Sequence, residues 1–352
     1  MAKRTRAPRQ SDIARLAGVT QSTVSLVLNG RAAEESIPQT TQDRVHAAVK
    51  ELQYVPNVAA TSLRGGRNGL IGVHTFEPVF PVASDDYYHP FLVGIEEQAV
   101  ELKVDLVLFA STQGDDGTRR IYANGTNRLR LADGAVMLGM EQNEEELVRL
   151  ASEQYPFVFI GRRDGASAQL PYVAPDYHQA LASVLEPLAE AGHRRIAYLG
   201  ETARRNPQEA RYEGFRAHVA RLGLGSGDPL FIAPDELNAE VFHGILREGS
   251  TALVIENHDS ATILAAIAQA VGLDIPRDLS VVVLDTVPDV SPARIWSQIR
   301  IPRRALGRRA ISVLMELLDG TIPNTYHELL PVEPPSTATI TSPHTSRSAI
   351  PT

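Results

Sequence analysis

The chain has 352 residues and no cysteine, and its 34 Lys and Arg against 42 Asp and Glu give a formal net charge of −8. This length suffices for two or three folding units with separate cores, and the absence of cysteine excludes disulfides, a CxxC redox pair and thiolate zinc sites. The sequence contains neither a run of about 18 apolar residues nor an apolar segment after MAKRTRAPRQ, so we expect a cytoplasmic protein with no membrane span.

Charge is distributed unevenly along the chain. Residues 1–67 contain ten Lys or Arg and five acids, a net charge of +5, which leaves −13 for the remainder. A basic segment is attracted to phosphates and an acidic one is repelled by them. The distribution therefore favours a nucleic-acid-binding head on an acidic body, with the Arg-rich first residues as an arm near DNA.

The first periodic stretch, residues 11–30, predicts two short helices joined by a tight turn. Ser11 and Thr20 are expected to cap these helices, and Gly18 and Gly30 to end them. Apolar residues recur at helical spacing, namely Ile13, Ala14, Leu16 and Ala17 in the first helix and Val24, Val27 and Leu28 in the second. The pattern is typical of a helix-turn-helix, whose second helix reads the major groove of DNA, although an αα-hairpin inside an enzyme would give the same pattern.

Two further helical segments follow. Residues 41–52 place Val45, Ala48, Val49 and Leu52 on one face, and Tyr54-Val55-Pro56 ends that helix. Residues 57–65 predict a fourth short helix or a helical linker, with too narrow an apolar stripe to fold alone.

From residue 69 onward, short apolar runs alternate with helical stretches. The first set has expected strands at 69–76, 104–111, 134–139 and 156–162, with helices at 90–102, 119–131 and 144–152. The second set has expected strands at 172–176, 195–201, 229–235, 251–257 and 280–285, with helices at 178–191, 209–222, 238–247 and 260–271. Because parallel neighbours need crossover helices, this alternation predicts two doubly wound α/β lobes facing a cleft. Residues 288–295 would then begin a crossing segment, and a helix at 304–318 would return to the first lobe.

Motifs that carry catalysis are missing from the sequence. It has no GxSxG, HExxH or GxxxxGK[ST] sequence. The glycines at 223, 225 and 227 follow a helix rather than a strand, which favours a loop over a phosphate cradle. His258 and Asp259 adjoin at a strand end, where a loop contact or helix cap is commoner than a general base. We therefore expect no catalytic residue, no metal and no cofactor.

The segments SDIARLAGVTQSTVSLVLNG and VHAAVKELQYVPNVAATSLRGGRNGLIGV resemble the LacI/GalR family of bacterial transcriptional regulators, and the later segments keep that family's order over nearly the whole chain. The resemblance implies an all-α helix-turn-helix head (1–56), a hinge helix or linker (57–67) and a two-lobed periplasmic-binding-protein-like α/β core of doubly wound parallel sheets (68–334). The N-lobe would comprise about 69–163 plus 293–322, and the C-lobe about 164–292 plus 323–334. Residues 335–352 lack apolar periodicity, which predicts a disordered tail.

The resemblance also implies which residues bind DNA. The expected contacts are Ser11, Thr20, Gln21, Ser22, Thr23, Ser25, Leu26, Asn29, Asn57, Ala60, Leu63 and Arg64. Leu63 would wedge into the minor groove of a palindromic operator. The family often has an Arg at the position of Leu26, so Leu26 would contact a thymine methyl, read no base, or be buried.

Small molecules bind where the carboxyl ends of parallel strands converge. Carried over from the family, the expected effector contacts are Tyr88, His89, Phe91, Arg162, Asp176, Arg211, Asn257, Asp285 and Trp296. His89 replaces the family's usual Asn, and Arg211 lies in EARYEGF, which is similar to the family's ERxxGF. An Arg fork and carboxylates can bind vicinal hydroxyls, and an aromatic ring can stack on a sugar face. Core packing is the alternative for each aromatic residue.

The sequence thus predicts a homodimeric repressor, and no enzyme, whose operator affinity is controlled by a sugar. Binding of this effector would close the cleft and unpack the paired hinge helices. Three alternatives stay open: a purine or nucleoside effector stacked on Phe91 and Tyr88, a corepressor response, and a sugar-modifying enzyme with a DNA-binding head. The missing phosphate loop argues against the last of these.

Overall fold

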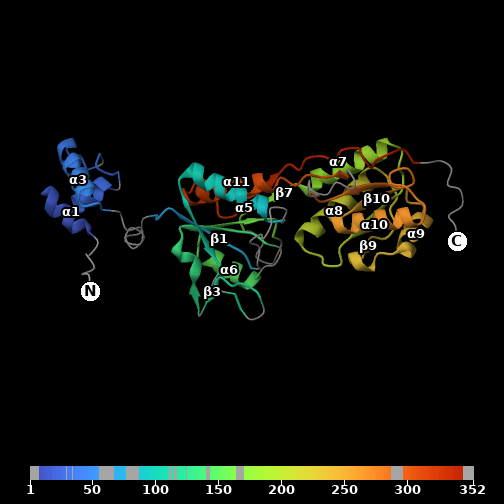
Figure 1. Ribbon diagram of the computed structural model, residues 1–352, viewed down its shortest axis with the longest axis horizontal. Helices are drawn as coiled ribbons and strands as arrows, with labels where there is room; N and C mark the ends of the chain where they lie inside the picture. Colours follow the sequence, from blue (N-terminus) through green and yellow to red (C-terminus); the bar gives the residue numbers. More distant parts are fainter. Residues whose placement is uncertain are drawn as a thin grey trace. The chain divides into compact units, whose positions relative to one another are not determined.

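The computed structural model describes residues 8–28, 30–33, 35–54, 67–76, 87–110, 113–114, 117–123, 125–139, 143–163, 170–286 and 296–343. The chain divides into two compact units, Met1–Asn68 and Gly69–Thr352, which we call the head and the core (Figure 1). Across these described ranges, no helix combines the length and apolarity needed to cross a bilayer.

The head contains the helices α1 (Gln10–Ala17), α2 (Gln21–Leu28) and α3 (Gln39–Glu51). Ile13, Val24 and Val45, one from each helix, are fully buried together at its centre. Gly18 ends α1 with a φ of 65°, a conformation that glycine adopts without strain. The Thr20 Oγ1 accepts the backbone N–H of Thr23 at 3.1 Å and so caps α2. The predicted helix-turn-helix is confirmed.

Two expectations about α1 are wrong. Ser11 does not cap the helix, because α1 begins at Gln10 and the Asp12 carboxylate accepts the backbone N–H of Arg9 at 2.9 Å. Leu16 is 46% exposed, since Ile13, Ala14 and Ala17 supply the contribution of α1 to the core. The third helix, α3, also starts two residues earlier than expected, directly after Pro38.

The first lobe of the core is built on a six-stranded parallel sheet in the order β13-β7-β6-β5-β1-β2 (Figure 1). The strands are β1 (Leu70–His74), β2 (Asp105–Phe109), β5 (Gly134–Met137), β6 (Phe157–Ile160), β7 (Tyr172–Pro175) and β13 (His327–Leu330). Its helices are α5 (His89–Leu102), α6 (Glu144–Ser152) and α11 (Arg303–Leu318). Every residue of β5 and β6 is buried, as expected for a parallel sheet covered on both faces.

The helix expected at 119–131 is wrong. This segment forms the antiparallel pair β3 (Tyr122–Ala123) and β4 (Thr126–Asn127), followed by the 3₁₀ helix η1 (Arg128–Leu131). Gly125 has a φ of 75°, which suits a tight hairpin turn and interrupts a helix. The Asn127 Oδ1 then accepts the backbone N–H of Leu129 at 2.9 Å and starts η1.

The second lobe is built on a five-stranded parallel sheet in the order β12-β11-β10-β8-β9. The strands are β8 (Ile196–Gly200), β9 (Leu230–Phe231), β10 (Ala252–Ile255), β11 (Ser280–Val283) and β12 (Ser297–Gln298). The helices are α7 (Tyr177–Glu190), α8 (Asn206–Arg221), α9 (Ala239–Arg247) and α10 (His258–Ala270), with the short 3₁₀ helix η2 (Pro234–Glu236). The doubly wound two-lobed architecture is therefore confirmed.

Three crossing segments connect the lobes and lie side by side. The first follows β7, the second links β12 to α11, and the third follows β13. Arg300 and Glu333 exchange two backbone hydrogen bonds of 3.1 Å, which pair the second crossing with the third. The backbone N–H of Asp176 donates to the Leu330 carbonyl at 2.8 Å, which pairs the first with the third. These bonds hold the three connections together as one hinge.

The lobe boundaries differ from those expected at three places. The strand at 172–175, expected in the second lobe, pairs with β6 and β13 in the first. The strand at 327–330 also belongs to the first sheet, and the strand at 297–298 belongs to the second. An apolar run predicts a buried strand but not its sheet, because both sheets bury the same residue types. Residues 288–295 of the expected crossing segment lie outside the described residues.

Part of the expected disordered tail is ordered. Thr339 is buried, its backbone N–H donates to the Ser297 Oγ at 2.8 Å, and its Oγ1 donates to the Val281 carbonyl at 2.5 Å. The backbone N–H of Thr341 donates to the Ser280 Oγ at 3.0 Å. Hydroxyl and backbone hydrogen bonds therefore fix this segment to the second lobe up to Thr341, although it lacks apolar periodicity. Residues 344–352 lie outside the described part of the chain.

Helices α5 and α11 pack backbone against backbone through two glycines. A Cβ on Gly94 would overlap the Arg304 carbonyl, and a Cβ on Gly307 would overlap the Phe91 carbonyl. Because backbone atoms cannot step aside as a flexible side chain can, only glycine fits at either position. This close approach sets the position of Phe91 relative to the start of α11.

We expect Gly307→Ala to destabilise the core by about 1–3 kcal/mol or more, because the added methyl forces α5 and α11 apart. The measurement is chemical denaturation of the full chain. Gly244→Ala in α9 is the matched control, since its Cβ would meet nothing within 4 Å and alanine is the better helix former. Equal stability of the two variants would refute this close packing.

Candidate functional site

The structure contains two candidate functional sites, a DNA-binding surface on the head and a pocket in the core. On the head, Gln21 and Ser22 are exposed in the first turn of α2, while Thr23, Ser25 and Leu26 are partly buried. Thr20 and Ser11 are also exposed. The remaining expected DNA contacts lie outside the described residues, namely Asn29, Asn57, Ala60, Leu63 and Arg64. Leu26 keeps intermediate exposure, so it is not a core residue of the head.

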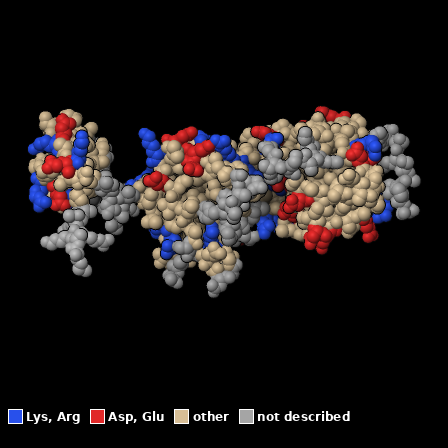
Figure 2. Space-filling model, viewed as in Figure 1, with Lys and Arg blue, Asp and Glu red and all other residues tan. Residues whose placement is uncertain are grey.

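The charge of the described part of the head is mixed, and Figure 2 shows basic and acidic side chains interspersed on its visible face. Four of the ten basic residues in 1–67 lie outside the described residues, namely Lys3, Arg4, Arg6 and Arg64. The positive excess of the head is therefore concentrated in its flanking segments.

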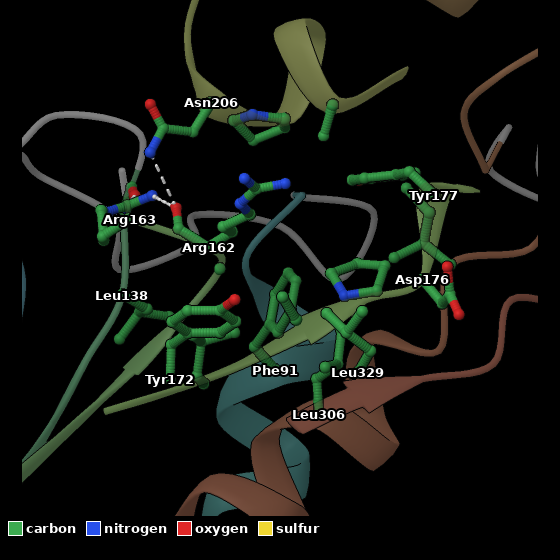
Figure 3. Close-up of a pocket in the computed structure, with 18 of the residues that line it drawn as sticks. Phe91, Leu138, Arg162, Arg163, Tyr172, Asp176, Tyr177, Asn206, Leu306 and Leu329 are labelled. Atoms are coloured by element: carbon green, nitrogen blue, oxygen red, sulfur yellow. Dashed lines mark hydrogen bonds between the residues drawn. The ribbon is translucent and has the colours of Figure 1, made fainter. Parts of the chain in front are cut away.

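The core pocket lies between the lobes, beside the hinge (Figure 3). The carboxyl ends of β5, β6 and β7 and the start of α5 line it from the first lobe, and the N-terminal parts of α7 and α8 line it from the second. Ile301, Leu306 and Leu329 come from the second and third crossings and the elements next to them. The cavity measures about 170 Å³, and since a water needs only about 10–15 Å³, a small organic molecule fits.

Most of the lining is apolar or aromatic, and the polar groups come from a few positions. Arg162 extends from the end of β6 into the space bordered by Phe91, Asn206 and Tyr177 (Figure 3). The Asn206 amide donates to the Arg162 carbonyl at 3.0 Å, which joins α8 to the first lobe. The Asp176 carboxylate caps α7 by accepting the backbone N–H of Gln179 at 2.9 Å.

Arg163 has a structural role at the pocket wall. Its guanidinium donates to the Gly139 carbonyl at 2.6 Å and to the Arg162 carbonyl at 2.9 Å, and it lies 3.8 Å from the centre of the Phe159 ring. Through these contacts the Arg163 guanidinium holds the loops after β5 and β6 together. Arg162, in contrast, extends into the cavity.

A charged cluster lies directly behind the tyrosines of the pocket wall. Arg211 donates to the Tyr177 hydroxyl at 3.1 Å and to the Glu256 carbonyl at 3.3 Å. Arg303 donates to the Asp285 carboxylate at 2.8 Å, and its guanidinium lies 4.1 Å from the centre of the Tyr87 ring. The cluster thus joins the carboxyl end of the second sheet to the first turn of α11.

Burial governs the ionisation of this cluster. It raises the pKa of the Tyr87 phenol, and the nearby Tyr177 adds to the shift. Burial alone would lower the pKa of Arg211, but Tyr177 and Asp285 outweigh it and raise that pKa. At neutral pH Tyr87 is therefore a neutral phenol and Arg211 a cation.

The structure brings together some of the expected effector contacts and separates others. Tyr88, Phe91, Arg162 and Asp176 line the pocket. Arg211 and Asp285 lie in the cluster behind it, and His89, Asn257 and Trp296 do not line it.

Two of the expected contacts have structural roles. Asn257 caps α10 by accepting the backbone N–H of Ser260 at 2.8 Å, and its amide donates to the Glu201 carboxylate at 3.1 Å. Trp296 is 5% exposed within the apolar core of the second lobe, so its ring is not free to stack on a ligand there.

Several pocket residues were missed in the sequence. Tyr87 and Tyr177 are sequence neighbours of the expected contacts Tyr88 and Asp176. Their position at the start of a helix that follows a strand could have identified them as pocket residues. Asn206, Ala210 and Glu213 share one face of α8, at the spacing that neighbouring turns of a helix require.

In the part of the chain that the structure describes, no group of three or more His, Asp or Glu side chains could hold a metal ion.

Comparisons with known proteins agree on the identity of both units. Residues 11–57 match the family model "Bacterial regulatory proteins, lacI family", and residues 185–335 match "Periplasmic binding protein-like domain". The transcriptional regulator AglR of Rhizobium meliloti is 30% identical over 327 residues, which cover 88% of this chain and 87% of AglR. The ribose operon repressor of Escherichia coli is 28% identical over 333 residues, which cover 92% of this chain and 96% of that one.

Solved structures give the same fold. The crystal structure of the lac repressor dimer, bound to operator and the anti-inducer ONPF, aligns with a TM-score of 0.66 at 22% identity. The alignment covers 96% of this chain and all of that one. The head matches the family model, a relative is 30% identical along most of the chain, and the fold is shared with a solved structure. The chain therefore belongs to the LacI family of bacterial regulatory proteins.

Proposed function

We propose that the chain is a cytoplasmic, homodimeric repressor that binds a palindromic operator through α2 and releases it when a sugar binds in the core pocket. One observation carries this proposal: a helix-turn-helix with exposed polar residues at the start of its second helix is joined to a core with a pocket between two lobes. Two similar proteins, the ribose operon repressor and the lac repressor dimer bound to its operator, support the sugar class, the dimer and the DNA. We assign no catalytic activity to it, in keeping with a family of regulators.

The proposed signal is a change of angle between the lobes. A ligand that contacts both Phe91 of the first lobe and Asn206 of the second favours the closed arrangement, with the paired crossings as the hinge. The Asp133 carboxylate accepts the backbone N–H of Gly69 at 2.8 Å and so fixes the first residue of the core to the first lobe. Movement of that lobe is thereby passed to the linker before it.

A nucleoside is the second candidate effector. Tyr88 and Phe91 line the pocket, and a flat base can stack on such rings with a gain of about 0.5–1.5 kcal/mol beyond burial. Arg162 and Asn206 supply hydrogen-bond donors beside them.

For DNA, we expect the double substitution Gln21→Ala with Ser22→Ala to weaken operator binding by about 1–3 kcal/mol for each base that these side chains no longer reach. Binding to random-sequence DNA should stay the same, because phosphate contacts are kept. The measurement is a titration at fixed salt with a palindromic operator selected from a randomised pool. Gln39→Ala, an exposed amide on α3, is the control. An equal reduction of affinity for both kinds of DNA would contradict base reading by α2.

For the effector, we expect Arg162→Ala to weaken the ligand response at least tenfold, about 1.4 kcal/mol, because the charged hydrogen bonds from its guanidinium to the ligand can no longer form. Operator affinity without ligand should stay near that of the unmodified chain. Calorimetric titration with a sugar identified by thermal-shift screening gives the affinity, and Arg128→Ala, an exposed arginine on η1, is the control. Unchanged ligand affinity in a folded Arg162→Ala protein would remove Arg162 from the site.

A further inference from the structure

The outward face of α2 carries no charge. Val24 and Val27 are buried in the core of the head, so the opposite face of the helix carries Ser22 and, one turn later, Leu26. Gln21 is exposed in the first turn beside them. None of the eight residues of α2 is acidic or basic. The face that enters a major groove therefore offers an amide, hydroxyls and an apolar side chain, but no cation.

Each base presents its own chemical groups in the major groove. Guanine shows two acceptors, N7 and O6, which an arginine or lysine side chain matches best. Adenine shows one acceptor and one donor, which a glutamine amide matches with a bidentate pair of hydrogen bonds. Thymine has a C5-methyl group that favours apolar contact, and a serine hydroxyl can bond to more than one base. The side chains of α2 thus match adenine and thymine and lack the partner that guanine needs.

The basic side chains of the described head come from other segments, namely Arg9, Arg15, Arg31, Arg44, Lys50 and Arg67. The Arg15 side chain on α1 is 81% exposed and pairs with Asp12 at 2.9 Å, and Arg44 on α3 donates to the Thr41 Oγ1 at 3.4 Å. Cations beside the helix in the groove are placed for phosphates, which hold a protein on any sequence and carry no direct base information. The head thus separates its cations from the helix that reads bases.

Leu26 is the apolar side chain on this face. It has intermediate exposure and is absent from the apolar core of the head, whereas Val27 and Leu28 contribute to that core. Its position four residues after Ser22 places it directly above the first turn on the same face. An aliphatic side chain offers no hydrogen bond, so it leaves the polar edge of guanine or cytosine unpaired, whereas it packs well against a thymine methyl.

We propose that each half-site of the operator has A·T base pairs at the positions that α2 reads, with Gln21 bonded to an adenine and Leu26 in contact with a thymine methyl. Guanine is not specified at these positions, because α2 has no cation to bond to its O6 and N7. This inference rests on the proposed DNA-binding function and narrows the class of operator.

The first test selects binding sites for the full-length chain from a randomised DNA pool at fixed salt. Gln21→Ala and Leu26→Ala are selected in parallel. The positions read by α2 are those at which the base preference of either variant differs from that of the unmodified chain. We expect A·T pairs at all of these positions.

The second test removes single groups from the selected operator. Uracil in place of thymine lacks only the C5-methyl group, and 7-deazaadenine in place of adenine lacks the N7 acceptor. We expect one uracil in each half-site to weaken binding of the unmodified chain about fivefold or more, and to have no effect on Leu26→Ala. One 7-deazaadenine in each half-site should behave in the same way toward Gln21→Ala.

A matched pair of variants supplies the missing cation. Leu26→Arg should create a preference for guanine of about 5–150-fold at one base pair of each half-site. Leu16 is 46% exposed on α1 and lies outside the reading helix. Leu16→Arg adds the same charge to the head, so it should strengthen binding to all sequences without a new base preference. Melting temperatures of the free proteins establish that each variant folds.

The outcomes that overturn the inference differ in what else they remove. A specified G·C pair at a position read by α2 would refute the A·T half-site and keep the DNA-binding function. Uracil that leaves binding of the unmodified chain unchanged, or that weakens Leu26→Ala equally, would refute the thymine contact. Enrichment of no sequence by the unmodified chain would refute the proposed operator binding, and the inference with it.

Discussion

The hydrogen-bonded hinge between the lobes is the constraint on which the rest of the core depends. Backbone bonds between Arg300 and Glu333, and from Asp176 to Leu330, tie three crossings of the chain into one strip. These bonds place the ends of β7 and β13 beside the starts of α7 and α11, and the pocket lies next to that junction. Because backbone groups make the strip, it fixes where the lobes join while the angle between them can still change.

The pocket wall combines rigid and adjustable parts. The glycine contact of α5 with α11 fixes Phe91, and Arg163 fixes the loop after β6. Arg162 depends on less packing of this kind, because its side chain extends into the cavity (Figure 3). Ligand recognition can thus reposition a few side chains without repacking either sheet, which suits a protein that must switch between two states.

Much of the fold could be predicted because the central strands of both sheets are buried on both faces and read as continuous apolar runs. The β5 and β6 runs are clear examples, as is the helix-turn-helix with Gly18 at its turn. Features that depend on specific hydrogen bonds were harder to predict from the sequence. The tail is held by Thr339 and Thr341, whose polarity suggests disorder in a sequence, and the hairpin at Gly125 lies inside a stretch that also suits a helix.

Residues that line the pocket could be predicted where a strand end defines the position, but not where tertiary packing decides. Tyr88, Phe91, Arg162 and Asp176 follow strands or start helices, and all four line the pocket. Trp296 shows the limit, since nothing in its local sequence distinguishes a ring packed in the core from a ring open to a ligand. The wall of Tyr87 and Tyr177 depends on two segments about 90 residues apart in the sequence, so it emerges only from the folded core.

The central claim is that the head and the pocket share one conformational equilibrium. The most direct measurement is the affinity of the full chain for its effector in the presence and absence of saturating operator DNA, together with operator affinity with and without saturating effector. Linkage requires the two ratios to be equal, and typical couplings of about 1–3 kcal/mol correspond to roughly 5–150-fold changes. Our account predicts equal ratios in this range, with effector binding weakened by operator. Effector affinity that is the same on and off the operator would contradict it.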